Sequence, residues 1–150
     1  MTDKYTDTIN VLETNIDDCS GEVLGYVLDK LFAAGAKDAF YTSIYMKKNR
    51  PAYKLTVLCF DDDVEKMEDI IFSETTSIGI RKRKEERVCL KRSFETVDTK
   101  YGKIDVKTVF VNDEKRIYPE FESVKKAAEK NNVPFSMVFD EAKHKGWFNK

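Results

Sequence analysis

The sequence has few of the residues that most often build metal sites and nucleophilic sites. It contains one histidine, His144, and three widely spaced cysteines, Cys19, Cys59 and Cys89. An odd number of cysteines without close pairs excludes a disulfide framework and a CxxC metal or redox motif. Free thiols suit a reducing compartment, so we expect a cytoplasmic protein.

The sequence also lacks a large net charge and long apolar runs. The 26 Lys and Arg residues nearly cancel the 27 Asp and Glu residues, which leaves a formal charge of −1. A chain without a net basic field is a poor nonspecific binder of nucleic acid. No stretch approaches the roughly 18 apolar residues that cross a membrane, and the polar N-terminus lacks the apolar part of an export signal. We therefore expect neither a nucleic acid nor a membrane as partner.

Hydrophobic periodicity predicts an α+β fold in residues 1–98. Strand-like alternation, or enrichment in β-branched and aromatic residues, occurs at residues 11–16, 37–48, 53–60 and 78–90. Apolar residues three and four apart mark two helices, one that begins near Ser20 and stops at Gly35 and one that begins near Asp63. The order βαββαβ predicts a ferredoxin-like split βαβ two-layer sandwich with both helices on one face of an antiparallel sheet.

Residues 99–150 are expected to form a smaller C-terminal subdomain. An alternating strand is predicted at residues 103–111. Pro119 and Pro134 stand where the first turn of a helix tolerates proline, so two short helices should follow. This subdomain should therefore contain one strand and two helices.

Polar side chains should line the open face of the larger subdomain, opposite its helices. Successive strand residues alternate between faces, which places Glu13, Asn15 and Asp17 on that side. The same alternation places Lys54, Thr56, Arg81 and Arg83 there. Such a row can hold a metal-bound triphosphate, since hard cations bind carboxylate and carbonyl oxygens and phosphate pairs with Arg and Lys. It can equally be the solvated face of a charge-balanced sheet.

Two loops contain further candidates. The turn Lys47-Lys48-Asn49-Arg50-Pro51 is either a phosphate clamp or a basic hairpin tip that discourages aggregation. The segment Thr75-Thr76-Ser77, ahead of Gly79, can wrap a phosphate or simply end a helix. Asp17 and Asp18 can bind a cation or cap the helix that follows them.

Six segments match one known family in the same order along the chain. They are Glu13-Thr14-Asn15-Ile16-Asp17-Asp18, Met46-Lys47-Lys48-Asn49-Arg50-Pro51, Lys54-Leu55-Thr56-Val57-Leu58, Glu74-Thr75-Thr76-Ser77-Ile78-Gly79-Ile80-Arg81, Tyr101-Gly102-Lys103 and Tyr118-Pro119-Glu120-Phe121-Glu122. Several motifs in register are more specific than any one of them. Together they resemble the C-terminal region of the LarC family, the nickel insertion enzymes that complete the nickel-pincer nucleotide cofactor of lactate racemase.

The resemblance implies a CTP-dependent cyclometallase. Its nucleotide is CTP with Mg²⁺ or Mn²⁺ on the phosphates, and it inserts nickel into a pyridinium-3,5-bisthiocarboxylate mononucleotide. Family members are longer, so the resemblance also implies an N-terminal region of the same enzyme as a partner. It favours a cation site at Glu13, Asn15, Asp17 and Asp18. It favours a nucleotide and phosphate site at Lys47, Lys48, Asn49, Arg50, Lys54, Thr75, Thr76, Ser77 and Arg81, and it indicates no catalytic residue.

Two functions remain open once the residues and the resemblance are taken together. The basic and acidic motifs favour an enzyme part that binds metal-CTP. Nickel prefers imidazole and thiolate ligands, and the chain offers no evident set of them, so the substrate or another segment must hold the nickel. That absence favours the alternative, a ferredoxin-like small-ligand regulatory or assembly module. Exposed sheet edges favour a homo-oligomer, a trimer or a hexamer, in either case.

Overall fold

The computed structural model describes residues 3–148, and the chain divides into two compact units. The first unit is Thr6–Arg87. The second joins residues 3–5 with the described residues from Val88 onward. The boundary expected after residue 98 falls inside strand β5 (Arg92–Thr99), because that strand belongs to the sheet of the second unit.

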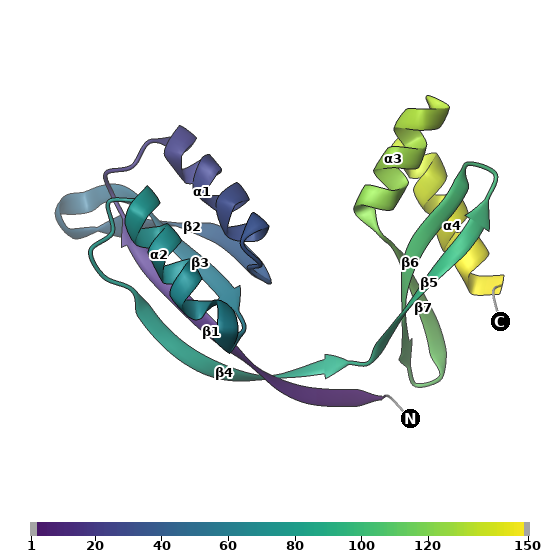
Figure 1. The fold of residues 1–150 in the computed structure, drawn as a ribbon, viewed down its shortest axis with the longest axis horizontal. Helices are drawn as coiled ribbons and strands as arrows, with labels where there is room; N and C mark the ends of the chain where they lie inside the picture. Colours follow the sequence, from purple (N-terminus) through teal and green to yellow (C-terminus); the bar gives the residue numbers. More distant parts are fainter. Residues whose placement is uncertain (1–2, 149–150) are drawn as a thin grey trace. The chain divides into compact units, whose positions relative to one another are not determined.

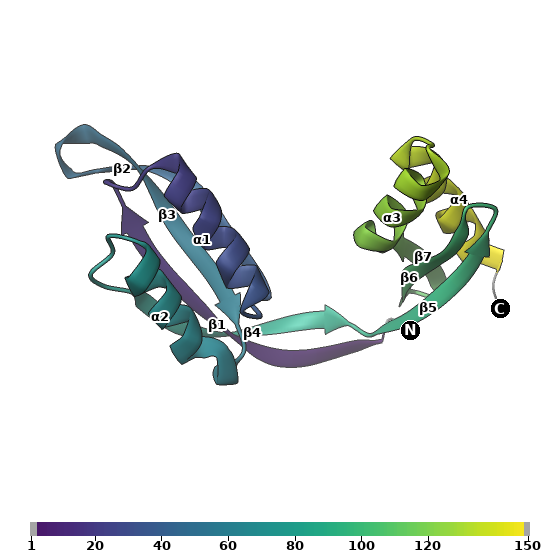
Figure 2. The ribbon, with the colours of Figure 1, turned by 45° about the horizontal axis from the view of Figure 1, so that its top comes forward.

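The first unit contains the predicted split βαβ arrangement. Its elements are β1 (Lys4–Ile16), α1 (Gly21–Ala33), β2 (Asp38–Met46), η1 (Lys47–Asn49), β3 (Arg50–Cys59), η2 (Asp61–Asp63), α2 (Val64–Glu74) and β4 (Arg81–Leu90). The sheet order is β2-β3-β1-β4, with β3 antiparallel to both β1 and β2. Both helices lie on one face of this sheet (Figures 1 and 2). The α+β sandwich is thus confirmed.

Strand alternation decides which side chains enter the core of the first unit. Leu12 and Ile16 of β1 are buried against the helices together with aliphatic residues of β3 and α1. Burial of each such side chain stabilises the fold by about 1.5–3 kcal/mol. The predicted stop of α1 is confirmed: Ala34 caps the helix, and Gly35 follows at φ 106°, a backbone conformation that glycine adopts without steric cost.

The last strand of the first unit is shorter than the sequence predicts. We expected a strand from residue 78, but β4 begins at Arg81. Ile78, expected to face the helices, is fully exposed at 100%. The reason is local: residues 75–80 form a loop that side-chain hydrogen bonds attach to β1 and α2, instead of pairing as a strand.

The sheet of the second unit has more strands than the sequence predicts. Its elements are β5, β6 (Gly102–Val111), β7 (Glu114–Pro119), α3 (Phe121–Asn131) and α4 (Phe135–Phe148), with sheet order β5-β6-β7. The prediction of a single strand was therefore wrong, whereas the two helices are confirmed. Only one residue of β5, Val97, is buried, so its sequence carries little apolar signal. Pro119 ends β7 instead of opening the helix, which begins two residues later.

None of the helices within residues 3–148 is both long and apolar enough to cross a lipid bilayer.

Candidate functional site

The loop between α2 and β4 is attached to the end of β1 by hydroxyl groups. Thr14 and Ser77 place their side-chain oxygens 2.5 Å apart, although they are separated by 63 positions. The Thr14 hydroxyl also donates to the carbonyl of Gly79 over 2.9 Å. Thr14 is only 2% exposed, so this attachment is shielded from solvent. The sequence segment that contains Ser77 therefore lies directly beside the segment that contains Thr14.

A second set of contacts joins the same loop to the start of α1. The Thr76 hydroxyl donates to the Asp18 carboxylate and lies 3.4 Å from the thiol sulfur of Cys19. Ser20 caps α1 by accepting from the backbone N–H of Val23 over 3.3 Å. Neither aspartate supplies that cap, so the carboxylates of Asp17 and Asp18 are not needed to begin the helix.

Thr75 has a different environment from its two neighbours. Its hydroxyl donates to the carbonyl of Ile71 over 2.7 Å and accepts from the backbone N–H of Ser77 over 3.1 Å. Both interactions close the end of α2. Of the three predicted hydroxyl residues, Ser77 contacts β1, Thr76 contacts the segment that leads into α1, and Thr75 ends α2.

The open face of the sheet carries the predicted row of charged and amide groups. Glu13 accepts from Lys54 over 3.2 Å and pairs with Arg83 over 3.1 Å. Arg81 donates to the Asn15 amide oxygen over 2.8 Å. The hydrogen bond from Arg83 lowers the pKa of Glu13, against the opposing effect of burial and with a further contribution from Lys54. Glu13 is therefore held ionised between two cations.

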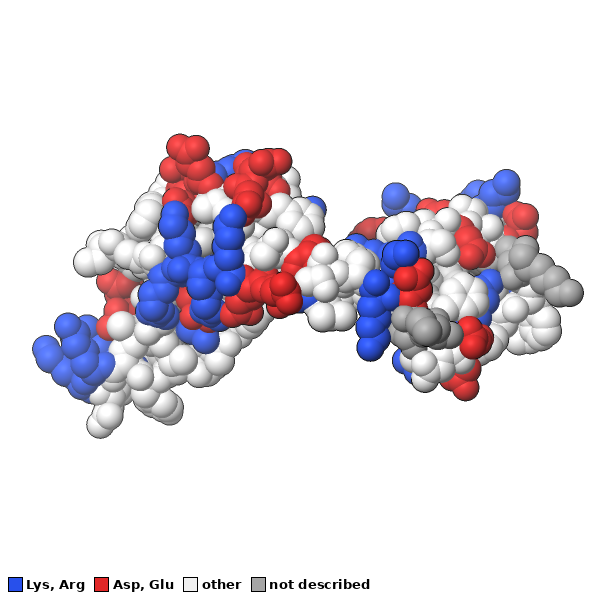
Figure 3. All heavy atoms as spheres, turned by 90° about the horizontal axis from the view of Figure 1, so that it is seen from below, with Lys and Arg blue, Asp and Glu red and all other residues white. Residues whose placement is uncertain are grey.

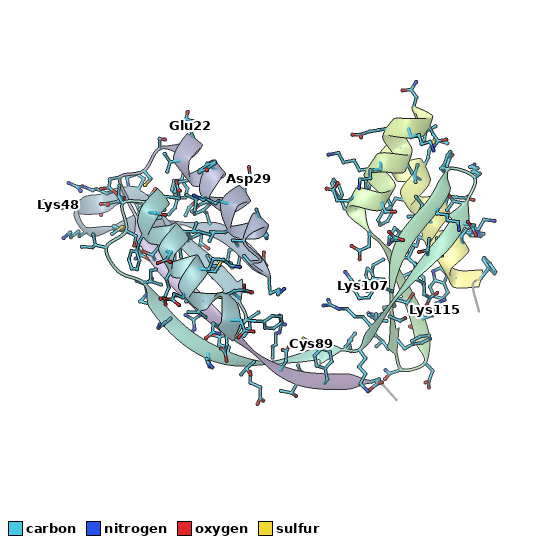
Figure 4. The ribbon with its side chains drawn as sticks, viewed as in Figure 1. Glu22, Asp29, Lys48, Cys89, Lys107 and Lys115 are labelled. Atoms are coloured by element: carbon cyan, nitrogen blue, oxygen red, sulfur yellow. The ribbon has the colours of Figure 1, made fainter. Side chains whose placement is uncertain are left out.

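The β2–β3 turn brings a third segment to the same end of the sheet. The Arg50 guanidinium lies 3.3 Å from the Asp17 carboxylate. Lys47, Lys48 and Asn49 are exposed, and within residues 3–148 neither lysine has a carboxylate partner. Figure 4 labels Lys48 at the tip of this turn, and Figure 3 shows a basic group at the corresponding end of the first unit. The turn therefore presents uncompensated positive charge.

The turn also holds its backbone in an uncommon conformation. Lys48 and Asn49 have φ values of 62° and 55°, in the left-handed region. Asparagine tolerates this region well, but a lysine there is uncommon. The turn therefore holds Lys48 in a conformation that glycine would adopt more easily.

The carboxylates of this region fit a nucleotide-bound cation better than a closed metal cage. No group of three or more His, Cys, Asp or Glu side chains among the described residues could hold a metal ion. Mg²⁺ commonly takes only one or two carboxylates and completes its shell with phosphate oxygens and water. Asp17 and Asp18, adjacent in sequence beside the turn and the loop, match that requirement. Glu13, Asn15 and Asp17 are each bonded to a cationic side chain, whereas Asp18 accepts a hydrogen bond from the Thr76 hydroxyl.

Sequence reasoning placed most of these residues and put Arg83 on the open face, but it left Thr14 and Arg83 out of the candidate site. Thr14 joins the loop to β1, and Arg83 is the main cause of the lowered Glu13 pKa. A signal for Thr14 was present, because it is the polar residue between Leu12 and Ile16 on the helix-facing side of β1. A buried hydroxyl on an apolar face requires a partner.

Comparison with known proteins gives one consistent result. A family model described as "Nickel insertion protein" matches residues 1–139. The chain is 51% identical over 131 residues to the pyridinium-3,5-bisthiocarboxylic acid mononucleotide nickel insertion protein of Alkaliphilus metalliredigens, and 50% identical over 138 residues to that of Acetivibrio thermocellus. These matches cover 87% and 92% of this chain but 31% and 34% of the relatives. The chain thus spans about a third of the length of these curated relatives.

A solved structure agrees with the sequence matches. It is described as LarC2, the C-terminal domain of a cyclometallase involved in the synthesis of the NPN cofactor of lactate racemase, in its apo form. The identity is 39%, the TM-score is 0.85, and the match covers 95% of this chain and 99% of the solved one. The chain therefore belongs to the nickel insertion protein family and has the fold of the LarC C-terminal domain.

Proposed function

We propose that this chain is the CTP-binding portion of a nickel insertase, or cyclometallase, that acts on the pyridinium-3,5-bisthiocarboxylate mononucleotide. One observation supports this most directly. Three segments distant in sequence, residues 13–18, 47–50 and 75–81, come together at one end of the first unit through direct side-chain contacts. Such convergence of hydroxyls, cations and carboxylates is typical of sites that bind a metal-bound triphosphate.

Each group in this region has a distinct role in the proposal. Lys47, Lys48 and Arg50 supply positive charge to the phosphates, and Asn49 and Arg81 supply hydrogen-bond donors. Thr76 and Ser77 donate hydroxyl hydrogen bonds from the opposite side of the site, while Lys54 keeps Glu13 ionised and in place. Asp17 and Asp18 would hold Mg²⁺ or Mn²⁺. The cation would neutralise the triphosphate and polarise its oxygens.

Because the chain is nearly neutral, a bound triphosphate must be neutralised by positive side chains placed next to it. With a formal charge of −1, the protein has no general field to attract a triphosphate. The positive charge must therefore be concentrated where the phosphates bind, and the β2–β3 turn is such a place. CTP binding should consequently weaken as the salt concentration rises.

Titration of the purified chain with CTP tests this proposal. CTP should bind more tightly than ATP, GTP and UTP, and only with Mg²⁺ or Mn²⁺ present. Equal binding of all four nucleotides, or binding that does not change when EDTA removes the cation, would contradict it.

Nickel enters the proposal as a substrate. The described residues contain no cluster of His, Cys, Asp or Glu that could carry it. We therefore propose that the remaining part of the full-length enzyme, or the organic substrate, orients the metal. Mixing the chain with Ni²⁺, CTP, Mg²⁺ and the unmetallated precursor should not activate apo lactate racemase. Robust multiple-turnover activation would place the whole active site in these residues.

The proposal extends to assembly and location. β2 and β4 are the edge strands of the first sheet, and free edges favour association, so we propose a homotrimer or homohexamer. All three cysteines are free, which suits the reducing cytoplasm. Sedimentation equilibrium of the chain decides the first point, because a monomer at high concentration contradicts it.

A further inference from the structure

A buried hydroxyl group of the second unit has no hydrogen-bond partner. Thr108 of β6 is 1% exposed, and none of the described residues forms a hydrogen bond with its side-chain oxygen. Alternation places Thr108 on the same face of the sheet as Ile104 and Val106, which are buried in the core of this unit. Burial of a hydroxyl without a partner is unfavourable. Its partner must therefore be a molecule that the chain itself does not supply.

A small cavity lies beside this hydroxyl. Its volume is about 270 Å³. A water molecule occupies about 30 Å³ of liquid, so the cavity has room for a molecule of roughly nine non-hydrogen atoms, which is smaller than a nucleotide. The lining combines charged, hydroxyl and aromatic side chains, all from the second unit: Asp3, Lys91, Arg92, Ser93, Thr108 and Phe110.

Two hydroxyl groups are neighbours on the wall of this cavity. The β5–β6 register places Ser93 directly opposite Thr108. The Ser93 hydroxyl donates to the Glu95 carboxylate over 3.5 Å, the long limit of a hydrogen bond, and no described residue donates to the Ser93 oxygen. The wall therefore offers a hydroxyl donor from Thr108 and a hydroxyl acceptor from Ser93.

A pair of opposite charges lines the exposed side of the cavity. Lys91 Nζ and Asp3 Oδ1 lie 3.1 Å apart, and their side chains are 62% and 61% exposed. The backbone N–H of Lys91 donates to the carbonyl of Asp3 over 3.0 Å, which holds the two residues side by side. Asp3 repels a ligand that is only anionic, and Lys91 repels one that is only cationic. A ligand with both charges on neighbouring atoms can pair with both residues.

The remaining lining residues have different roles. The Phe110 ring is 48% exposed and does not belong to the buried core of the unit. Covering such a ring with an apolar group removes both surfaces from water. The Arg92 guanidinium lies 5.8 Å from the centre of the Phe94 ring, so it is already engaged by an aromatic partner. Phe110 is therefore the apolar wall, and Lys91 is the cation available to a ligand.

We infer that this cavity binds a free α-amino acid with an apolar side chain. The ammonium group of the ligand pairs with Asp3 and donates to the Ser93 oxygen. Its carboxylate pairs with Lys91 and accepts from the Thr108 hydroxyl, and its side chain covers the Phe110 ring. The site shares no residue with the triphosphate site proposed above, and the inference does not rest on the proposed function.

The arrangement of charges favours a free amino acid over the end of a peptide. An amino acid carries its ammonium and carboxylate on the same carbon atom, at a separation that matches the adjacent pair of Lys91 and Asp3. A peptide end carries only one of these charges, and the rest of the peptide exceeds the volume of the cavity. The preferred ligand is therefore small and zwitterionic.

Calorimetric titration of the full 150-residue chain with leucine tests the inference. Two analogues each lack one charge: leucinamide has no carboxylate, and isocaproate has no ammonium group. Each should bind roughly ten- to a hundredfold more weakly than leucine, because one charge-assisted interaction is lost. Glycine should also bind more weakly than leucine, because it leaves the Phe110 ring uncovered.

Two variants locate the site. Thr108→Val should weaken leucine binding roughly two- to tenfold without lowering the melting temperature of the free protein, because the lost hydroxyl has no partner there. Lys91→Gln should weaken leucine but not leucinamide, since only a carboxylate pairs with this lysine. Thr96→Val is the matched control: it removes an exposed hydroxyl of β5 that donates to Asp105, outside the cavity, and should bind leucine like the parent.

Several outcomes overturn the inference. If leucine does not bind while Mg-CTP still binds, water alone satisfies the Thr108 hydroxyl and the proposed function is unaffected. If leucinamide or isocaproate binds as tightly as leucine, the cavity does not select a zwitterion. If Thr108→Val binds leucine like the parent, the amino acid lies elsewhere. Loss of CTP binding alone does not affect the inference.

Discussion

The hydroxyl oxygens of Thr14 and Ser77 lie 2.5 Å apart, and both are within hydrogen-bonding distance of the Gly79 carbonyl. This contact attaches to β1 the loop between α2 and β4, which contains Thr76 and leads into Arg81. The buried Thr14 hydroxyl is therefore both a stabilising group and a positioning group for the proposed CTP site.

Thr14→Val should lower the free energy of unfolding by about 1 kcal/mol, because it removes a buried hydrogen bond without changing side-chain shape. Urea denaturation measures this. Thr56→Val is the matched control: Thr56 is 4% exposed in the same sheet, but its hydroxyl has no partner, so the change should be neutral or stabilising. If both variants lose the same free energy of unfolding, the Thr14 hydrogen bond does not stabilise the fold as proposed.

Arg50→Ala and Lys48→Ala should each weaken Mg-CTP binding about ten- to a hundredfold, because charge-assisted hydrogen bonds to phosphate are lost. Calorimetric titration at two salt concentrations measures both the affinity and its salt dependence, which should become shallower. Lys66→Ala removes a lysine of α2 that pairs with Asp63 at the end of η2, and it should leave binding unchanged. If Arg50→Ala and Lys48→Ala both bind Mg-CTP like the parent, the turn does not bind the phosphates.

Ser20→Ala should change the stability of the protein, whereas Asp18→Asn should change how its CTP binding depends on Mg²⁺. Ser20 is the observed N-cap, so its loss should cost about 0.5–2 kcal/mol of stability and leave CTP affinity unchanged. Asp18→Asn retains an acceptor for Thr76 but removes a charge that the cation needs. It should melt like the parent without ligand and bind CTP with little dependence on Mg²⁺. Thermal unfolding with and without CTP and Mg²⁺ distinguishes the two variants. If Asp18→Asn lowers the melting temperature but leaves the Mg²⁺ dependence of CTP binding unchanged, Asp18 is not part of the site.

Glu13 should make stability depend on pH in the acid range. The Arg83 hydrogen bond lowers its folded-state pKa below the ordinary value of 4.5. Its contribution to stability is therefore complete above pH 4.5 and is lost as the pH falls through the folded-state pKa. Glu13→Gln should be less stable than the parent at pH 7 by about 0.2–1 kcal/mol, and the difference should vanish in acid. Urea midpoints from pH 7 to pH 3 test this, and a gap that widens in acid would contradict it.

Alkylation of the cysteines should report ligand binding. Cys59 is buried and burial raises its pKa, so it should react slowest. Cys19 lies 3.4 Å from the Thr76 hydroxyl, so Mg-CTP should slow its modification. Cys89, half-buried in β4, is the internal control and should react at the same rate with and without ligand. Mass spectrometry of the modified peptides would falsify the placement of the site if the ligand protected Cys89 but not Cys19.

Local patterns predicted much of the first unit because the relevant forces act between near neighbours. Alternation in β1 and β3 placed Glu13 and Lys54 on one face, and the structure pairs them over 3.2 Å. The helix stop at Gly35 followed from glycine's tolerance of positive φ. β5 was missed because its side chains are largely solvated, and its pairing with β6 is made by backbone groups that any sequence possesses.

The sequence by itself determined the α+β class, the faces of the main strands and the residue types available to bind phosphate. It also carried the motifs that relate this chain to nickel insertion proteins. Only the tertiary structure decided that Thr76 meets Asp18, that Thr75 closes α2 instead, and that Ser93 of β5 lies opposite Thr108 of β6. The physical reason is that such contacts depend on loop paths and strand register between distant segments, and no local preference encodes either of them.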